Sequence, residues 1–143
     1  MMNNENGRSM VEMLGVLAII GVLSVAGIAG YSMAMRKYRA NEIAQAVSTT
    51  AILAKTANGG TGITEDKTYD QLTNATAPAN STITAKANTS GTAFSGVVEI
   101  ETNDNDLCKA VQSIIGDNSN NPLYVATNDK CTSNGTSLKV TVK

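Results

Sequence analysis

The most constraining feature of this chain is an uncharged stretch near its N-terminus. No Asp, Glu, Lys or Arg occurs from Met13 to Met35. A helix of that length reaches about 35 Å, and the hydrocarbon core of a bilayer is about 30 Å thick. Glu12 borders the stretch, and a lone carboxylate costs about 2.5–3.5 kcal/mol near the centre of a bilayer. We therefore expect a membrane-spanning helix, with Glu12 as a candidate functional residue that needs a neutralising partner.

The residues that lead into this stretch form a specific pattern. The run GRSMVEMLGVLAIIGVLS, from Gly7 to Ser24, resembles the N-terminal signature of type IV pilins and pseudopilins. In that family a short leader ends in glycine, prepilin peptidase cuts after it, and a glutamate follows close to the new N-terminus. The resemblance implies a leader of residues 1–7, a cut between Gly7 and Arg8, methylation of the Arg8 amine and an assembly role for Glu12.

Two roles for Glu12 are compatible with these residues. The resemblance implies that its carboxylate pairs with the N-terminal amine of a neighbouring subunit, which removes the cost of burying either charge alone. Ser9-Met10-Val11-Glu12 also fits the S-x-x-E capping box, in which both side chains satisfy amides at a helix start. In addition, Arg8 lies four residues before Glu12, a spacing that allows an intramolecular pair. We favour the pairing between subunits and keep the cap as its alternative.

Small residues recur at every third position along the apolar segment. They are Gly15, Ala18, Gly21, Ser24, Gly27 and Gly30. Rows at this spacing form one of the two ridge-and-groove sets on a helix, and Ala26, Gly30 and Ala34 add a small-xxx-small pattern. Glycine is also frequent in ordinary membrane helices. The regular spacing favours a groove for lateral packing in a bundle of helices.

Charges return directly after the apolar segment and mark the water boundary. They are Arg36, Lys37, Arg39 and Glu42. Apolar residues then continue at helical spacing until the stop signal Asn58-Gly59-Gly60. These residues are Tyr38, Ile43, Ala46, Val47, Thr50, Ile52, Leu53 and Ala54. The pattern predicts one helix from Ser9 to Ala57, with an amphipathic second half packed on a globular head.

The remaining sequence predicts a small head with one further helix. Residues 58–80 are expected to form a loop with a helical turn at residues 69–72. A helix is predicted over Asn105–Ile115, capped at Asn105 or Asp106 and ended by Gly116. The predicted strands are Thr82–Ala87, Ala93–Glu101, Leu123–Thr127 and Ser137–Val142.

These elements place the chain in the α+β class. We expect a long N-terminal helix, apolar in its first half, packed on a small antiparallel sheet, which is also the arrangement of pilins. The expected divisions are the leader 1–7, a transmembrane and filament-core helix 8–35, and a head 36–143 that includes residues 36–57 of the long helix.

Two observations on orientation disagree. The cations after the apolar segment favour retention of the C-terminal part inside the cell by the positive-inside rule. The resemblance implies the opposite: a single-pass protein of the bacterial inner membrane, its head in the periplasm, and later an extracellular pilus. We follow the resemblance.

The cysteines are interpreted in that light. In an exported head, Cys108 and Cys131, the only cysteines, are expected to form one disulfide, as in the C-terminal region of pilins and most like the type IVb branch. A two-cysteine metal site is the weaker alternative, because the chain has no His.

Catalysis finds no support in this sequence. Without His, nucleophile–base sets lack their usual base, so we expect no enzyme activity, no cofactor and no metal. Asn103–Asp106 and Asp117-Asn118 offer oxygen ligands that suit Ca²⁺, but capping and turn roles explain them better. The formal net charge is −1, and no basic patch is long enough to indicate nucleic-acid binding.

The sequence therefore predicts a structural subunit of a type IV pilus. It would be processed by prepilin peptidase and polymerised through its apolar helix into a helical homopolymer, with the help of pilus or secretion assembly machinery. One alternative is a pseudopilin of a type II secretion system. Another is a single-span membrane protein whose exposed head binds a ligand without polymerising.

Overall fold

The computed structural model describes residues 2–88, 90–91 and 93–143, with side chains from residue 9 onward. The chain divides into two compact units, Met1–Met35 and Arg36–Lys143. The first unit consists of helix, and the second is an α+β head. The predicted fold class is confirmed: a long N-terminal helix packs on an antiparallel sheet through its second half.

Helix α1 spans Met2–Gly60 and starts earlier than predicted. Residues before Ser9 are already helical, so Ser9 is an interior helix residue. Regular helical backbone stops at Ala57, whose ψ of 156° is extended. Asn58 and Gly59 follow with φ values of 52° and 72°, a left-handed conformation that glycine adopts without steric cost. The predicted stop signal is thus confirmed.

The part of α1 in the head buries one face. Its buried residues recur at intervals of three and four, which is the spacing of one helical stripe. They are Ala40, Ile43, Ala46, Val47, Thr50, Ala51 and Ala54. Tyr38 and Ile52, expected in the apolar pattern, are 63% and 62% exposed. That expectation was wrong for both residues, because they lie on the opposite side of the helix from the stripe.

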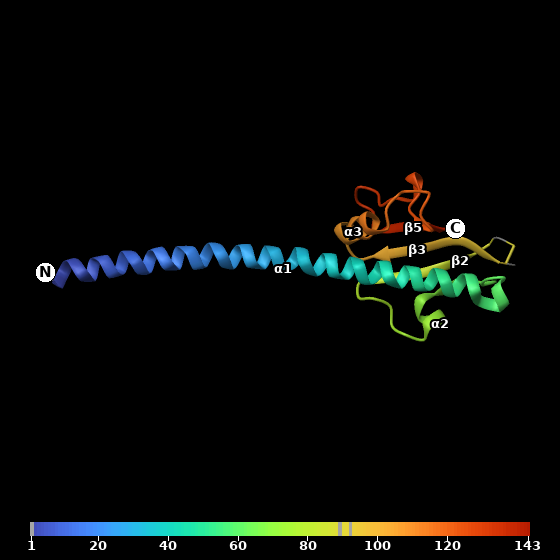
Figure 1. Ribbon diagram of the computed structural model, residues 1–143, viewed down its shortest axis with the longest axis horizontal. Helices are drawn as coiled ribbons and strands as arrows, with labels where there is room; N and C mark the ends of the chain where they lie inside the picture. The colour runs from blue at the N-terminus through green and yellow to red at the C-terminus, as the bar shows by residue number, and fades with distance from the viewer. Residues whose placement is uncertain (1, 89, 92) are drawn as a thin grey trace. The chain divides into compact units, whose positions relative to one another are not determined.

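The head contains a five-stranded sheet of order β1-β2-β3-β5-β4, with every neighbouring pair antiparallel. The strands are β1 (Lys67–Thr68), β2 (Ser81–Ala87), β3 (Phe94–Thr102), β4 (Leu123–Tyr124) and β5 (Ser137–Val142). The helices are α2 (Tyr69–Thr73), α3 (Asn105–Ile115) and the 3₁₀ turn η1 (Thr127–Asp129). Figure 1 shows β2, β3, β5 and α3 beside the second half of α1.

One predicted strand was too long. The strand expected over Leu123–Thr127 ends at Tyr124. The N–H of Val125 donates to the carbonyl oxygen of Gly116 (2.9 Å), which takes this residue out of the ladder with β5, and Thr127 begins η1. The two-residue strand β1 was not predicted, because two residues carry no periodic pattern.

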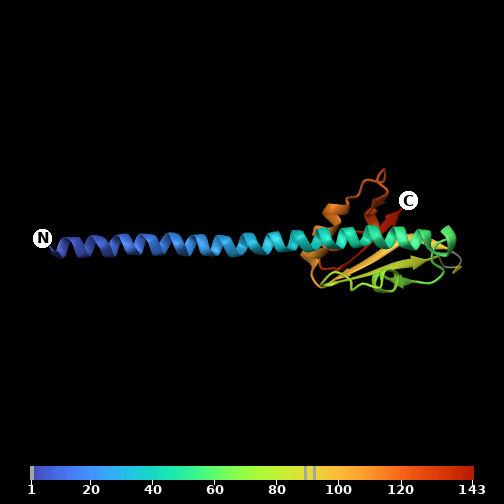
Figure 2. The same ribbon diagram turned by 60° about the horizontal axis from the view of Figure 1, so that its bottom comes forward.

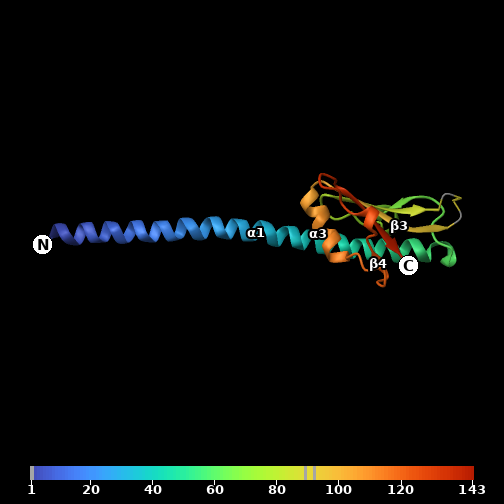
Figure 3. The ribbon, with the colours of Figure 1, turned by 90° about the horizontal axis from the view of Figure 1, so that it is seen from above.

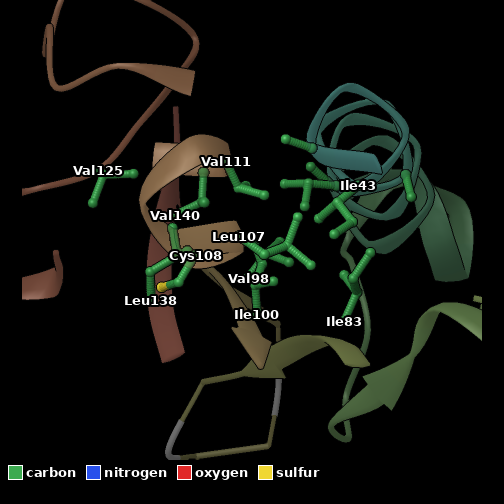
Figure 4. Close-up of a cluster of buried hydrophobic side chains, with 14 residues drawn as sticks. Ile43, Ile83, Val98, Ile100, Leu107, Cys108, Val111, Val125, Leu138 and Val140 are labelled. Carbon is green, nitrogen blue, oxygen red and sulfur yellow. The ribbon is translucent and has the colours of Figure 1, made fainter. Parts of the chain in front are cut away.

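The core lies between one face of the sheet and the two main helices. Buried residues alternate along the strands, as expected for a half-covered sheet: Ile83 and Ala85, Val98 and Ile100, Leu138 and Val140. Leu107, Cys108 and Val111 of α3 and the buried stripe of α1 complete the cluster. Figure 4 shows Ile43 of α1 facing the strand residues with the α3 residues beside it, and Figure 2 shows the sheet along one side of α1.

Helix α3 is bounded as predicted, but its cap differs. The Oδ1 atom of Asp104 accepts from the N–H of Asp106 (3.0 Å), so Asp104 is the N-cap in place of Asn105 or Asp106. At the other end, the N–H of Gly116 donates to the carbonyl oxygen of Gln112 (2.8 Å), which confirms the predicted end.

The segment between α3 and β5 is tied back to α3 at several points. The expected disulfide between Cys108 and Cys131 is present. The N–H of Cys131 also donates to Oε1 of Gln112 (2.9 Å), and Nδ2 of Asn105 donates to the carbonyl oxygen of Thr132 (2.8 Å). This segment has little regular structure, so its position in the head depends mainly on the disulfide and on these hydrogen bonds to α3.

The first prediction concerns the disulfide. The double substitution Cys108→Ser/Cys131→Ser should lower the free energy of unfolding of the head by about 3 kcal/mol, because the open chain regains loop entropy. Urea titration of the full chain in detergent, followed by circular dichroism, measures this loss. Reductant should weaken the wild type to the same extent and leave the variant unchanged. Equal stabilities of the two oxidised proteins would contradict the prediction.

Candidate assembly interface

The apolar half of α1 is uncovered by the rest of the chain. Every side chain from Ser9 to Ala34 is exposed. Among its large apolar side chains, Ile20 is the least exposed at 52% and Ile28 the most at 71%. Contiguous apolar surface of this extent marks a contact with membrane or protein. Among the described residues, α1 is the one helix long and apolar enough to cross a membrane.

The glycines of this half have no packing role within the chain. A Cβ atom built at Gly15, Gly21, Gly27 or Gly30 would meet nothing within 4 Å. Gly62 in the head is different, because a Cβ there would lie 2.8 Å from the Cβ of Phe94. Each glycine in a helix costs about 1 kcal/mol relative to alanine. The reason for four such glycines therefore lies outside the single chain.

The row of small residues winds around the helix. A helix turns by about 100° per residue, so each step of three residues falls short of a full turn by about 60°. From Gly15 to Gly30 the row therefore sweeps about 300° and reaches most sides of the helix. Ser24 can stand in this row of small residues because its polar group is satisfied within the helix: its hydroxyl donates to the carbonyl oxygen of Ile20 (2.7 Å). Such a row permits close approach by several neighbours, whereas a single stripe would serve one.

A second set of small residues stays on one side. Ala26, Gly30 and Ala34 are four residues apart, and each step advances only about 40° beyond a full turn. Spacing of this kind lets two helix backbones approach closely over a longer contact. The two patterns together describe a helix suited to close contacts on more than one side.

Glu12 lies on α1 with an exposed side chain, three residues before Gly15. The capping box requires a helix that starts at Ser9, but α1 already runs through this residue. The capping interpretation is therefore wrong for the uncut chain. Gly7 and Arg8 lie outside the residues whose side chains are described, so the cut, the methylation and a pair between Arg8 and Glu12 stay predictions.

The head residues that could serve as Ca²⁺ ligands form capping, turn and ion-pair contacts. Asp104 caps α3, and Oδ1 of Asn118 accepts from the N–H of Asn120 (3.0 Å) in a turn. A hydrogen bond and ion pair with Lys130 (Nζ–Oδ2 2.8 Å) lowers the pKa of Asp117. Within the described part of the chain, no three His, Cys, Asp or Glu residues come close enough to hold a metal ion. The capping and turn roles expected for these residues are present.

One further carboxyl of the head has a shifted pKa. The N–H of Ala87 donates to Oδ1 of Asp66 (2.7 Å), and this hydrogen bond, with a contribution from Lys86, lowers the pKa of Asp66. The pKa of Lys86 is raised in turn by its hydrogen bond to Asp66 (Nζ–Oδ2 3.2 Å). These groups connect β2 to the segment before β1, so they belong to the structure of the head.

Sequence reasoning missed an apolar groove beside α1. A hollow of about 350 Å³ is lined by Ala51 and Ile52 of α1, Pro122 just before β4, Leu123 of β4 and Val142 of β5. Figure 3 shows β4 alongside this part of α1. The residues that line it lie far apart in the sequence, so no local pattern predicts it.

No protein-family model matches the sequence, and neither the curated proteins nor the solved structures compared with it contain a match. The resemblance of the N-terminal residues to pilins therefore enters only the proposals about function that follow.

The second prediction tests the glycines within the single chain. Gly21→Ala/Gly27→Ala should retain or raise the helical content of the full chain in detergent, because alanine is the better helix former and meets no neighbour. Circular dichroism of the monomer measures this. As a matched comparison, Gly62→Ala should destabilise the head, since its Cβ would press on Phe94 and its φ is +90°. A loss of helix in the double variant would contradict the prediction.

Proposed function

We propose that this chain is a pilin-like structural subunit that polymerises through the apolar half of α1. The observation that carries the proposal is an exposed apolar helix whose glycines contact nothing in their own chain. The head has its own core, made without the residues before Ala40. The apolar half is therefore available for contacts with lipid first and with other subunits later.

Polymerisation of such helices needs a source of specificity. Lipid tails are as apolar as Leu side chains, so transfer from the bilayer to a helix bundle gains little hydrophobic free energy. Close packing and polar contacts must therefore supply the free energy of association between the helices. The winding row of small residues supports close contacts with several neighbours, as the centre of a helical fibre requires.

Glu12 supplies the polar contact in this proposal. A cut after Gly7 would create an amine at Arg8, a short distance along the chain from the carboxylate. Pairing of that amine with Glu12 of an adjacent subunit would neutralise both charges inside an apolar bundle. The same contact would fix the axial offset between neighbours, because the amine and the carboxylate lie at different heights on the helix.

The head is suited to a place outside the cell. Its C-terminal segment is held by the Cys108–Cys131 disulfide, a bond that persists in oxidising compartments. We propose a precursor in the bacterial inner membrane with the head in the periplasm, followed by incorporation into an extracellular type IV pilus. The alternative is a pseudopilin of a type II secretion system, which has the same N-terminal features but forms a short periplasmic fibre, and the disulfide favours the pilus.

The third prediction concerns processing. In cells that contain prepilin peptidase, the mature chain should begin at Arg8, because the enzyme would cut after Gly7. Mass spectrometry of the N-terminal peptide from membranes and from sheared filaments measures this start, and a mass increment of one methyl group would reveal methylation. Gly7→Val should block the cut. An intact N-terminus in assembled material would refute the proposal, and an intact N-terminus without filaments would favour the non-polymerising membrane protein.

The fourth prediction separates charge pairing from the shape of the Glu12 side chain. Glu12→Gln retains size and hydrogen bonding but removes the charge, so filament yield should fall at least tenfold while membrane insertion stays normal. Electron microscopy and quantification of sheared filaments give the yield. Glu42→Gln, which removes an exposed carboxylate of the head, is the matched control and should assemble normally. Normal assembly of Glu12→Gln would disprove the pairing.

A further inference from the structure

Three cations follow the apolar segment within one helical turn. Arg36, Lys37 and Arg39 come directly after Met35, with Tyr38 between the last two. Their Cα atoms span about 5 Å along the helix axis, so they form one level on α1. We refer to residues 36–39 as the basic collar.

The side chains of the collar lie on different sides of the helix. With Ala40, which is fully buried, as the reference direction, Arg36 lies about 40° to one side and Lys37 about 60° to the other. Arg39 lies about 100° away on the same side as Arg36, and Tyr38, which is 63% exposed, lies almost opposite the buried side. The three cations thus occupy an arc of about 160°, and Tyr38 completes the collar on the other side of the helix. A layer of headgroups around an inserted helix would meet all of it.

The cation nearest the core already has an acidic partner. Arg36 forms an ion pair with Asp106 in the first turn of α3 (Nη2–Oδ2 3.7 Å). The other two differ. Within the described part of the chain, Lys37 and Arg39 form no ion pair, and both are exposed. Elsewhere in the head, Lys86 and Lys130 pair with acids. The two outward cations of the collar are therefore available to external anions.

We infer that the basic collar binds the phosphate groups of anionic phospholipids and holds the unassembled subunit at the membrane surface. The inference rests on the membrane-inserted precursor of the proposed function. Anionic headgroups attract each nearby Lys or Arg, and tyrosine is enriched at the same level of the bilayer. Phosphate binding would also explain why the chain carries cations at this position, although they disfavour translocation of the head under the positive-inside rule.

The test measures lipid preference of the full chain in detergent by native mass spectrometry. Phosphatidylglycerol and phosphatidylcholine are added at equal concentration, and the ratio of their bound forms is read. The wild type should prefer phosphatidylglycerol, and Lys37→Gln/Arg39→Gln should reduce the ratio by about fivefold for each cation removed. Arg36→Gln should change it less, because Asp106 already engages that charge. Lys67→Gln/Lys109→Gln, which removes two exposed head cations, is the control and should match the wild type.

Three results would overturn the inference. They are an absence of lipid preference in the wild type, an equal loss in the control variant, and displacement of phosphatidylglycerol by excess inorganic phosphate, which would indicate a general anion site. Carbonate extraction of cell membranes tests the proposed function separately. A wild-type chain that is extracted would contradict the inserted precursor, whereas a retained chain without lipid preference would contradict the collar alone.

Discussion

The structure depends on the different environments of the two halves of helix α1. In the head, α1 places a stripe from Ala40 to Ala54 against the sheet and α3, and this contact creates the core. From Ser9 to Ala34 the side chains of the same helix are exposed, although the large ones are apolar. Apolar burial contributes roughly 25 cal/mol per Å² removed from water, so the uncovered half must be satisfied by lipid or by other molecules. Arg36, Lys37 and Arg39 follow directly after this uncovered half.

The glycines of the apolar half are the basis for the proposal that this half packs against other helices. Glycine lowers helix stability, and no neighbour in the chain requires it at Gly15, Gly21, Gly27 or Gly30. In the account proposed here, small residues permit close approach on several sides, and Glu12 selects the axial offset between subunits. In the same account, the basic collar holds the precursor at the membrane surface until the subunit is incorporated.

Local signals predicted much of the fold, and contacts distant in sequence account for the errors. Helix α3 and strand β5 have the predicted bounds, because Gly116 and the alternation of Leu138, Val140 and Val142 are short-range signals. The exposure of Tyr38 and Ile52 depends on where the sheet meets α1, which apolar content alone does not reveal. Strand β4 is short because Val125 bonds to Gly116. For the site, spacing identified the small-residue row, but only the structure shows that its glycines are uncovered.

The central claim is that Glu12 pairs with the N-terminal amine of another subunit. Filaments assembled from a mixture of ¹⁴N- and ¹⁵N-labelled chains, treated with a carbodiimide that joins amines to carboxylates without a spacer, test it most directly. The account predicts an amide between the Arg8 amine and the Glu12 carboxylate whose two peptides carry mixed isotopes in the cross-linked product. A product with both peptides always from the same isotope, or no such amide in well-formed filaments, would contradict the account.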